Sequence, residues 1–283
     1  MRTNAIVRII LFSIAILVLL TILVVGIAAD QFMFRNDFGH HATTSSCGDA
    51  DADVIRNISI EWTSGAITIR PGNADQIVFS ETETEKADPM VWITAGDTLK
   101  ISCTQDEKFF HIGVVPDKDL LIEVPRDWIC DGIEIDTASA DVNVEDLTIG
   151  KVDFDGASGD FDFQDCTVDH LEIDTASGDL NFCGSLNTMD CDGASADCQI
   201  ALTNCPSRIE MDLASGDLDL TLPDCCGFTA SLEALSGKLD TDFQVSHTEK
   251  GFVSGDGSCR IDMSAMSGNV VIHKSTEPWN CDH

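Results

Sequence analysis

From residue 54 onward, hydrophobic and polar residues alternate in short runs separated by glycine, proline and aspartate. Alternation with a period of two is typical of a β-strand that buries one face. The first predicted strands flank Ser64-Gly65, and further ones cover residues 76–80, 90–94, 98–103, 111–115 and 120–124. The β-branched content of these runs and their turn residues favour strands over helices. We predict no amphipathic helix after residue 30, so the fold class is all-β.

A repeat begins at Ile133 and fills most of the remaining chain. Each close copy has the form Asp-x-Ala-Ser followed by Gly or Ala and then Asp. The close copies centre on Ser139, Ser158, Ser177, Ser195 and Ser215, and looser copies centre on Ser236 and Ser267. The serine spacings are 19, 19, 18, 20, 21 and 31 residues. A period this regular indicates structural units that pack on their neighbours.

Counting from each serine shows which positions face the interior. Positions −6 and −4, and positions +3 and +5, are hydrophobic in the five close copies, whereas the positions between them are mostly Asp, Asn or Glu. This pattern predicts two strands with one buried face, joined at a Ser-Gly corner. Glycine suits a turn with positive φ, but Ala140 and Ala196 replace it in two copies, so not every corner needs that conformation.

Two architectures satisfy this pattern. In a parallel β-solenoid, or β-helix, coils of about 19–20 residues stack so that equivalent strands lie about 4.8 Å apart. In a meander of hairpins, Ser-Gly would instead be a two-residue turn. Identical residues at identical positions of each copy favour the solenoid. The stretch from Thr241 to Ile261 breaks the repeat and is predicted to be a loop insertion.

The N-terminal residues 9–29 are almost entirely apolar, and these 21 residues are enough to cross a bilayer as a helix. Arg2 and Arg8 precede the segment and Asp30 follows it, which places the N-terminus in the cytoplasm and exports the rest. A cleaved signal peptide is the alternative, with small residues at Gly26 and Ala28. The expected localisation is the cell membrane, as a single-pass protein with an extracytoplasmic C-terminal domain.

The predicted organisation follows from these segments. It comprises a cytoplasmic N-terminus (1–8), a transmembrane signal-anchor helix (9–29), a linker (30–53), an N-terminal β region (54–130), the Ser-Gly-Asp β-repeat region (131–274) and a C-terminal tail (275–283).

The charge of the chain restricts its partners. Acidic residues outnumber basic ones 49 to 16, which gives a formal net charge of −33. Nucleic-acid binders need Lys and Arg to neutralise phosphate, so we predict no nucleic-acid partner. The expected contacts are the membrane, through the N-terminal helix, and an unidentified protein or glycan at the cell surface.

The 12 cysteines leave three alternatives open. No Cys-x-x-Cys pair is present, so the usual zinc and thioredoxin motifs are missing. Outside the cell the cysteines could form disulfides. Facing a dry core they could be small hydrophobic residues, and metal ligation is the third alternative.

Several segments of the chain carry a resemblance to a known family. Leu-Ile-Glu-Val-Pro125 is followed by Ile-Glu-Ile-Asp-Thr-Ala-Ser139 and by repeated segments such as Asp-Thr-Ala-Ser177-Gly-Asp-Leu. Over residues 54–274 the chain resembles the putative-adhesin β-strand-repeat family, bacterial membrane-anchored surface proteins with a domain of unknown function. The resemblance implies a surface protein, and it supplies no catalytic residues to carry over.

The repeated aspartates are the candidate metal ligands. Positions −3 and +2 hold aspartate in every close copy, and stacking would form two columns of like charges that repel one another. Calcium bridging between coils could offset that repulsion, because hard cations prefer oxygen ligands. Alternatively, corner aspartates accept backbone N–H bonds and stay solvated. The calcium candidates are Asp136, Asp155, Asp174, Asp192 and Asp212; no other cofactor is predicted.

The sequence favours a non-enzymatic scaffold or adhesin-like module over an enzyme. Gly156-Ala-Ser158-Gly159 lacks the residue that a nucleophile elbow places between Ser and the second Gly. The same serine recurs in every copy, which fits a corner and not a unique nucleophile. The alternative is a β-helical hydrolase acting on cell-wall or extracellular polysaccharide through paired carboxylates.

Overall fold

The computed structural model describes residues 42–82, 88–103, 117–249 and 251–275, and every helix or strand in these ranges is a β-strand. Contacts divide the chain into Met1–Ala42 and Thr43–His283, and all the strands belong to the second unit. None of the described residues forms a helix long and apolar enough to span a bilayer. The predicted anchor, residues 9–29, lies outside the described residues.

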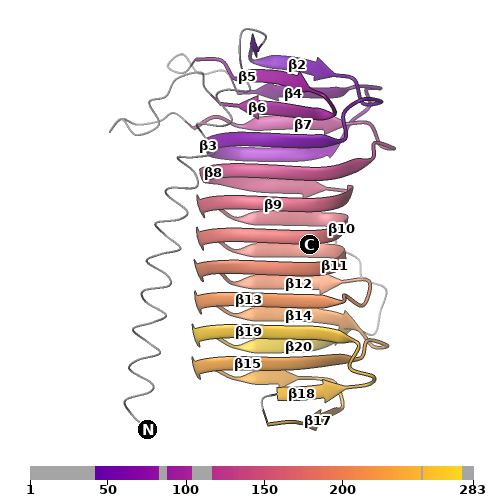
Figure 1. The fold of residues 1–283 in the computed structure, drawn as a ribbon, viewed down its shortest axis with the longest axis vertical. Helices are drawn as coiled ribbons and strands as arrows, with labels where there is room; N and C mark the ends of the chain where they lie inside the picture. Colours follow the sequence, from indigo (N-terminus) through magenta and orange to yellow (C-terminus); the bar gives the residue numbers. More distant parts are fainter. Residues whose placement is uncertain (1–41, 83–87, 104–116, 250, 276–283) are drawn as a thin grey trace. The chain divides into compact units, whose positions relative to one another are not determined.

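Parallel strands stacked in coils form the body of this unit (Figure 1). In register, Ser158, Ser177, Ser195 and Ser215 lie side by side on neighbouring coils. The prediction of a parallel solenoid is therefore confirmed for the repeat, and the hairpin meander is wrong. The stacked strands are β3 (Asn57–Pro71), β8 (Cys130–Glu145), β9 (Thr148–Ser158), β10 (Phe161–Ser177), β11 (Leu180–Ser195), β12 (Cys198–Leu202), β13 (Arg208–Ser215), β14 (Leu218–Pro223), β15 (Phe228–Ser236), β16 (Leu239–Thr241), β19 (Cys259–Ser267) and β20 (Val270–Ser275).

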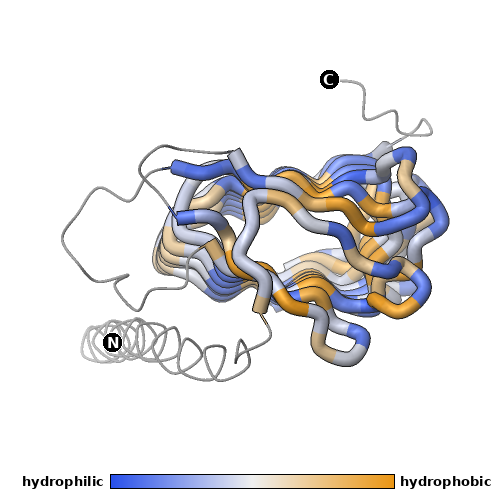
Figure 2. Tube along the Cα trace, turned by 90° about the horizontal axis from the view of Figure 1, so that it is seen from above, coloured by the Kyte–Doolittle hydropathy of each residue, from blue (hydrophilic) through white to orange (hydrophobic). Residues whose placement is uncertain are grey.

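Each coil contributes to two layers that enclose the core. The segments before the serine stack into a first layer, as in β9 on the second half of β10, and the segments after it stack into a second layer. Seen along the stack, hydrophobic and hydrophilic positions alternate along the strands and recur from coil to coil (Figure 2). The predicted inward positions are buried, and Phe154 of the first layer meets Phe161 of the second with ring centroids 4.1 Å apart.

The Ser-Gly corner brings the backbones of neighbouring coils very close together. Gly178 has φ +150°, and a Cβ there would lie 1.9 Å from the carbonyl oxygen of Gly159 in the adjacent coil. Ala140 and Ala196 are buried at their corners and do not have positive φ, as the sequence indicated. Glycine is therefore needed at Gly178 because of the close approach of the two coils as well as its own φ.

The coils do not stack in chain order at the C-terminal end. The β19–β20 coil lies between the β13–β14 coil and the β15–β16 coil, as Figure 1 shows. Ser267 therefore lies beside both Ser215 and Ser236, although Ser236 precedes it in the chain. The segment that follows β14 consequently passes over one coil position before β15 begins.

At the N-terminal end the coils are also stacked out of chain order. β3 lies between β8 and the pair β6 (Thr98–Ser102) and β7 (Leu120–Val124), which follow it in the chain. β1 (Thr43–Thr44), β2 (Cys47–Ala50), β4 (Ile77–Glu81) and β5 (Val91–Ala95) then add antiparallel pairs. Residues 43–50, expected within the linker, therefore contribute two strands to the sheet. The predicted strand at residues 111–115 lies outside the described residues.

A buried ion pair holds this N-terminal end together. Lys118 forms a salt bridge with Glu81, and both side chains are almost completely buried. The Lys118 ammonium also donates hydrogen bonds to the carbonyl oxygens of Asp88 and Cys103, each at 3.0 Å. These carbonyls supply the additional partners that a buried charge requires.

The interruption of the repeat is a hairpin and not a loop. β17 (Val245–His247) and β18 (Gly251–Ser254) pair antiparallel, and β18 also pairs antiparallel with β15. The predicted loop insertion therefore covers the edge of the last coil. Covering an edge in this way protects its backbone groups from pairing with another chain.

Replacing Gly178 tests the close approach at the corner. We expect Gly178→Ala to lower the free energy of unfolding by about 3 kcal/mol, because the new methyl group meets a backbone carbonyl that cannot move freely. Gly96→Ala is the control, since Gly96 also has positive φ but has nothing within 4 Å of an added Cβ. Its expected cost is about 1 kcal/mol. Equal losses in urea unfolding of the two variants would contradict the interpretation.

Candidate functional site

The outer surface of the first layer carries a column of stacked carboxylates, which we call the acidic column. Register pairs join each member to the next along β3, β8, β9, β10, β11 and β13. The structure thus brings all five predicted aspartates together. The members of the acidic column are Glu61, Asp136, Asp155, Asp174, Asp192 and Asp212.

Glu61 is a member that the sequence analysis missed. It stands three residues before Ser64, which is the position that aspartate occupies in the later copies. The flanking Ile58, Ile60, Ile67 and Ile69 repeat the alternation of those copies, so the first coil could have been aligned with them.

Stacking shifts the proton affinity of the acidic column. Partial burial, together with the neighbouring carboxylates of Asp155 and Asp192, raises the pKa of Asp174 to about 6. Partial burial and the carboxylate of Asp212 also raise the pKa of Asp192. At Glu61 burial raises the pKa, while a hydrogen bond from Ser102 opposes the shift. The column therefore holds its negative charges against desolvation and mutual repulsion.

A second row of acidic residues, two positions earlier in each coil, is neutralised in part. Lys151 forms salt bridges with Asp153 at 2.7 Å and with Glu172 at 2.8 Å. Arg208 contacts Asp190 at 3.1 Å. The Lys151 ammonium lowers the pKa of Glu172. Such exposed pairs contribute little stability individually, but they place cationic side chains directly beside the carboxylates of this second row.

A groove of about 430 Å³ follows the Ser-Gly corners on the side of the stack. It is lined by Ser139, Asp141, Ser158, Gly159, Asp160, Ser177, Gly178, Asp179 and Ser195. No histidine, lysine or cysteine is among these residues, so the only candidate bases in the lining are the repeated aspartates. The groove repeats one set of groups and lacks a distinct reactive constellation.

The corner aspartates at position +2 bond to the backbone of the next coil. Asp141 accepts a hydrogen bond from the Asp160 N–H at 3.0 Å, and Asp160 accepts one from the Asp179 N–H at 3.0 Å. Asp179 and Asp197 continue the series, with bonds of 3.1 and 2.8 Å. The expectation that corner aspartates accept backbone N–H groups is therefore confirmed for position +2, with each donor in a neighbouring coil.

The described histidines lie apart from the groove. His170 is bonded to Thr188 at 2.8 Å on the first layer. His273 contacts Asp242 at 2.9 Å, and this carboxylate raises the pKa of the imidazole. His247 packs on the ring of Phe252. Each occupies a separate place, so the structure brings no histidine to a repeated serine in the described ranges.

One cluster in the described ranges brings three candidate metal-ligand atoms within 4.8 Å of one another. It consists of the sulfur atoms of Cys205, Cys225 and Cys226, and not of the acidic column. Cys205 and Cys226 are joined as a disulfide, which removes two of the three thiolates. In this state the cluster is not a metal centre, because the thiolate is the metal-binding form of cysteine.

The described cysteines include both disulfide-bonded residues and free thiols buried in the core. Cys183 is disulfide-bonded like Cys205 and Cys226. Six free cysteines are instead buried in the core, and burial raises the pKa of Cys166 to about 12. These six thiols behave as small hydrophobic side chains. They are Cys103, Cys130, Cys166, Cys191, Cys198 and Cys259.

Comparison with known proteins assigns the chain to a family. The model of the family Toastrack DUF4097 matches residues 55–205 and 131–273. The chain therefore belongs to this family, in agreement with the resemblance seen in its repeats. No curated protein matches the chain.

Three solved structures are similar over most of the chain. A "putative cell adhesion protein" from Clostridium sporogenes is 11% identical, with a TM-score of 0.41 over 83% of this chain and 100% of its own. A "putative adhesin" from Bacteroides fragilis is 14% identical, with a TM-score of 0.45 over 84% and 98%. A "putative lipid binding protein" from Parabacteroides distasonis is 12% identical, with a TM-score of 0.36 over 84% and 98%.

Asp174→Asn should stabilise the protein in a pH-dependent way. The pKa of Asp174 is raised to about 6 in the folded protein, so folding favours the protonated carboxyl. The stability that this protonation contributes is complete below about pH 3.8 and is lost as the pH rises through about 6, where the ionised carboxylate destabilises the fold. We expect the substitution to raise the free energy of unfolding at pH 7 by about 1 kcal/mol, allowing for screening at this half-exposed site. Near pH 3.5 the gain should disappear.

Asp162→Asn is the control for this substitution, because it removes the same charge from the second layer. Urea unfolding at both pH values should show a smaller change for it than for Asp174→Asn at pH 7. A gain at Asp174 that is equal at pH 7 and pH 3.5 would contradict the assignment.

Calcium should have no specific effect on thermal stability. Because no three carboxylate oxygens of the described acidic column converge within 4.8 Å, we expect millimolar Ca²⁺ and Mg²⁺ to change the melting temperature equally and by a few degrees at most. Scanning calorimetry with each cation and with a chelator measures this. A rise specific to Ca²⁺ that Asp174→Asn abolishes would establish the column as a calcium site.

Proposed function

We propose that this member of the Toastrack DUF4097 family is a non-enzymatic interaction scaffold, membrane-anchored and extracytoplasmic, that binds a cationic partner along the acidic column. The observation that carries the proposal is the column itself. Six carboxylates repeat on the first layer at the spacing of neighbouring strands. An adhesin-like role at the cell envelope is the biological form of this proposal.

The geometry suits a partner with several regularly placed positive charges. Strand neighbours lie about 4.8 Å apart, so a polycation lying along the stack meets one carboxylate in each coil. Binding several weak sites at once gives an affinity that no single ion pair supplies. The raised pKa of Asp174 supports the same idea, because a cation placed there relieves the repulsion from Asp155 and Asp192.

The extracytoplasmic placement rests on the apolar segment 9–29 and on the arginines before it. The disulfide between Cys205 and Cys226 supports an oxidising compartment.

Protease added to intact cells should therefore digest the domain. Protection until the cells are lysed would overturn this part of the proposal.

The scaffold is preferred to a polysaccharide hydrolase because the polar groups of the corner groove are repeated. A catalytic acid and base need different environments to hold their pKa values apart. In the groove, Asp160 and Asp179 have the same environment, each accepting a hydrogen bond from the next coil. This equivalence supports a structural role for the corner aspartates.

A charge-matched pair of variants tests the proposed binding surface. We expect the soluble fragment of residues 31–283 to bind poly-lysine, and Asp155→Asn, Asp174→Asn and Asp192→Asn together to weaken binding about tenfold. The control removes three charges from the second layer through Glu145→Gln, Asp162→Asn and Asp219→Asn, and should weaken binding about twofold. Calorimetric titrations at several salt concentrations would measure both.

Two outcomes would count against the proposal. Equal losses in the two triple variants would mean that net charge, and not the acidic column, attracts the polycation. Turnover of a peptidoglycan or glycan substrate by the same fragment would show an enzyme and overturn the non-enzymatic role.

A further inference from the structure

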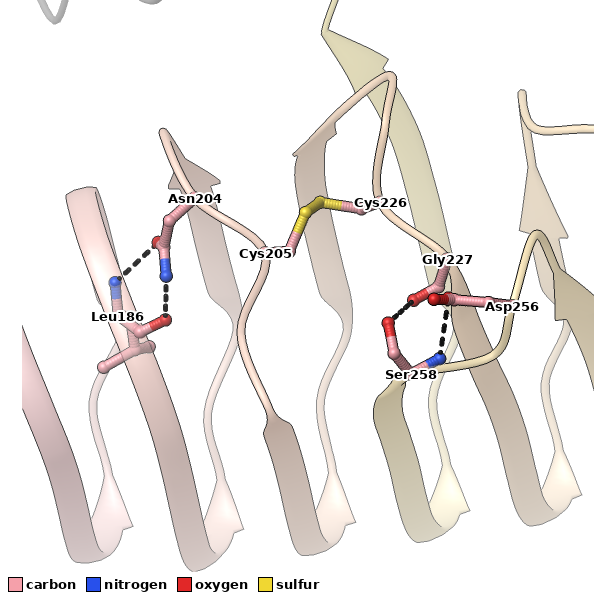
Figure 3. Close-up of a disulfide and its surroundings, with 7 residues drawn as sticks. All are labelled: Leu186, Asn204, Cys205, Cys226, Gly227, Asp256 and Ser258. Carbon is pink, nitrogen blue, oxygen red and sulfur yellow. Dashed lines mark hydrogen bonds between the residues drawn. A yellow bond between two sulfur atoms is a disulfide. The ribbon is translucent and has the colours of Figure 1, made fainter.

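The strongest candidate for a second site is the cysteine cluster beside the exchanged coils. Cys205 lies between β12 and β13, and Cys225 and Cys226 lie between β14 and β15. The disulfide from Cys205 to Cys226 spans a Cα–Cα distance of 5.4 Å. Figure 3 shows it joining two loops at one edge of the stack. The disulfide therefore links the segment between β14 and β15, which passes over the β19–β20 coil, to the loop that precedes β13.

A free thiol lies beside this disulfide. Cys225 is unbonded and exposed, and its sulfur lies within 4.8 Å of the sulfurs of both Cys205 and Cys226. Cys205 is also exposed, whereas Cys226 is buried. A thiol and an accessible disulfide sulfur are thus held together at the surface, which is the arrangement that thiol–disulfide exchange requires.

The backbone beside Cys226 is held by hydrogen bonds and close packing, whereas Cys205 and Cys225 are exposed. Next to Cys226, the carbonyl oxygen of Gly227 accepts hydrogen bonds from the Cys259 N–H at 3.0 Å and from the Ser258 hydroxyl at 3.2 Å (Figure 3 draws the Ser258 bond). A Cβ at Gly227 would lie 2.0 Å from Oδ1 of Asp256. The backbone at Gly227 is therefore held tightly, while Cys205 and Cys225 face solvent.

This exposure separates the cluster from the other free cysteines. Burial raises the pKa of Cys166 and Cys259 to about 12, so those thiols stay protonated and out of contact with solvent. Cys225 is exposed, and it has a disulfide within reach. Cys47 is exposed as well but belongs to β2, in the N-terminal group of strands.

We propose that Cys205, Cys225 and Cys226 form a thiol–disulfide exchange site. The Cys225 thiolate attacks Sγ of Cys205, a Cys205–Cys225 bond forms, and the Cys205–Cys226 bond breaks. The electron pair of the broken bond goes to Sγ of Cys226, which then takes up a proton. One disulfide and one thiol are present before and after the step, so no oxidant or reductant is required.

The exchange moves the free thiol between the surface and the interior. With Cys205 bonded to Cys226, the exposed thiol of Cys225 can react with thiols or disulfides of other molecules. With Cys205 bonded to Cys225, the remaining thiol is the buried one. In both forms a disulfide links the loop before β13 to the segment between β14 and β15. The exchange therefore changes the exposure and reactivity of the free thiol and leaves the two loops cross-linked.

Mapping which cysteine of the cluster carries the free thiol, in the wild-type full chain, tests the proposal. The protein, kept in detergent, is incubated at pH 8, denatured in acid and alkylated with N-ethylmaleimide. Tandem mass spectrometry then assigns the label to Cys225 or Cys226. We expect both labelled forms, reaching a constant ratio at pH 8 and no interconversion at pH 4, because the thiolate is the attacking species. A label confined to Cys225 after hours at pH 8 would overturn the proposal.

Three variants make the test independent of that ratio. Cys226→Ser should form the Cys205–Cys225 disulfide, and recovery of two free thiols from the folded variant would refute the exchange. Cys225→Ser should show one disulfide form only. Cys47→Ser should leave the ratio unchanged, since Cys47 is an exposed thiol elsewhere in the fold. If Cys226→Ser does not fold, the label distribution of the wild type decides.

Discussion

The whole structure depends on the in-register stacking of equivalent residues at the spacing of neighbouring strands. Parallel pairing places each residue of one coil beside its counterpart in the next, as with Asp174 between Asp155 and Asp192. For hydrophobic positions this arrangement is favourable, because every coil buries a row against the rows on either side. For charged positions the same arrangement forces like charges together.

The two columns of aspartate respond to this constraint differently. At the corner, a carboxylate such as Asp160 accepts the backbone N–H of the next coil, so the stacking that brings the charges together also supplies their hydrogen bonds. On the first layer, Asp174 remains in a desolvated and repulsive position, and its pKa rises as a result. Such an unfavourable arrangement persists at functional sites more often than elsewhere, which makes this column the better candidate for binding.

The ends of the stack show how a repetitive fold is terminated. At both ends the chain exchanges the order of two coils and then adds antiparallel strands. A coil inserted between two others pairs on both sides, and the antiparallel strands cover the remaining edge. The crossing segment that this exchange requires contains Cys225 and Cys226, and Cys226 is bonded to Cys205 in the loop before β13.

The amino-acid sequence alone was sufficient to predict the strands of the repeat, their inward positions and the five stacked aspartates, because period-2 alternation and a constant repeat are local properties. It did not predict β1 and β2 in the expected linker, or the hairpin of β17 and β18, because these short strands lie outside the repeat. Glu61 was missed, although it stands three residues before a Ser-Gly pair, because that copy lies apart from the main repeat. Only the tertiary structure decided the coil order, since Ser236 and Ser267 have nearly the same local pattern and either could pack on Ser215. The bonding of Cys205 to Cys226 was also decided by the tertiary structure, because it requires the loop before β13 and the loop after β14 to lie side by side, with the two Cα atoms 5.4 Å apart.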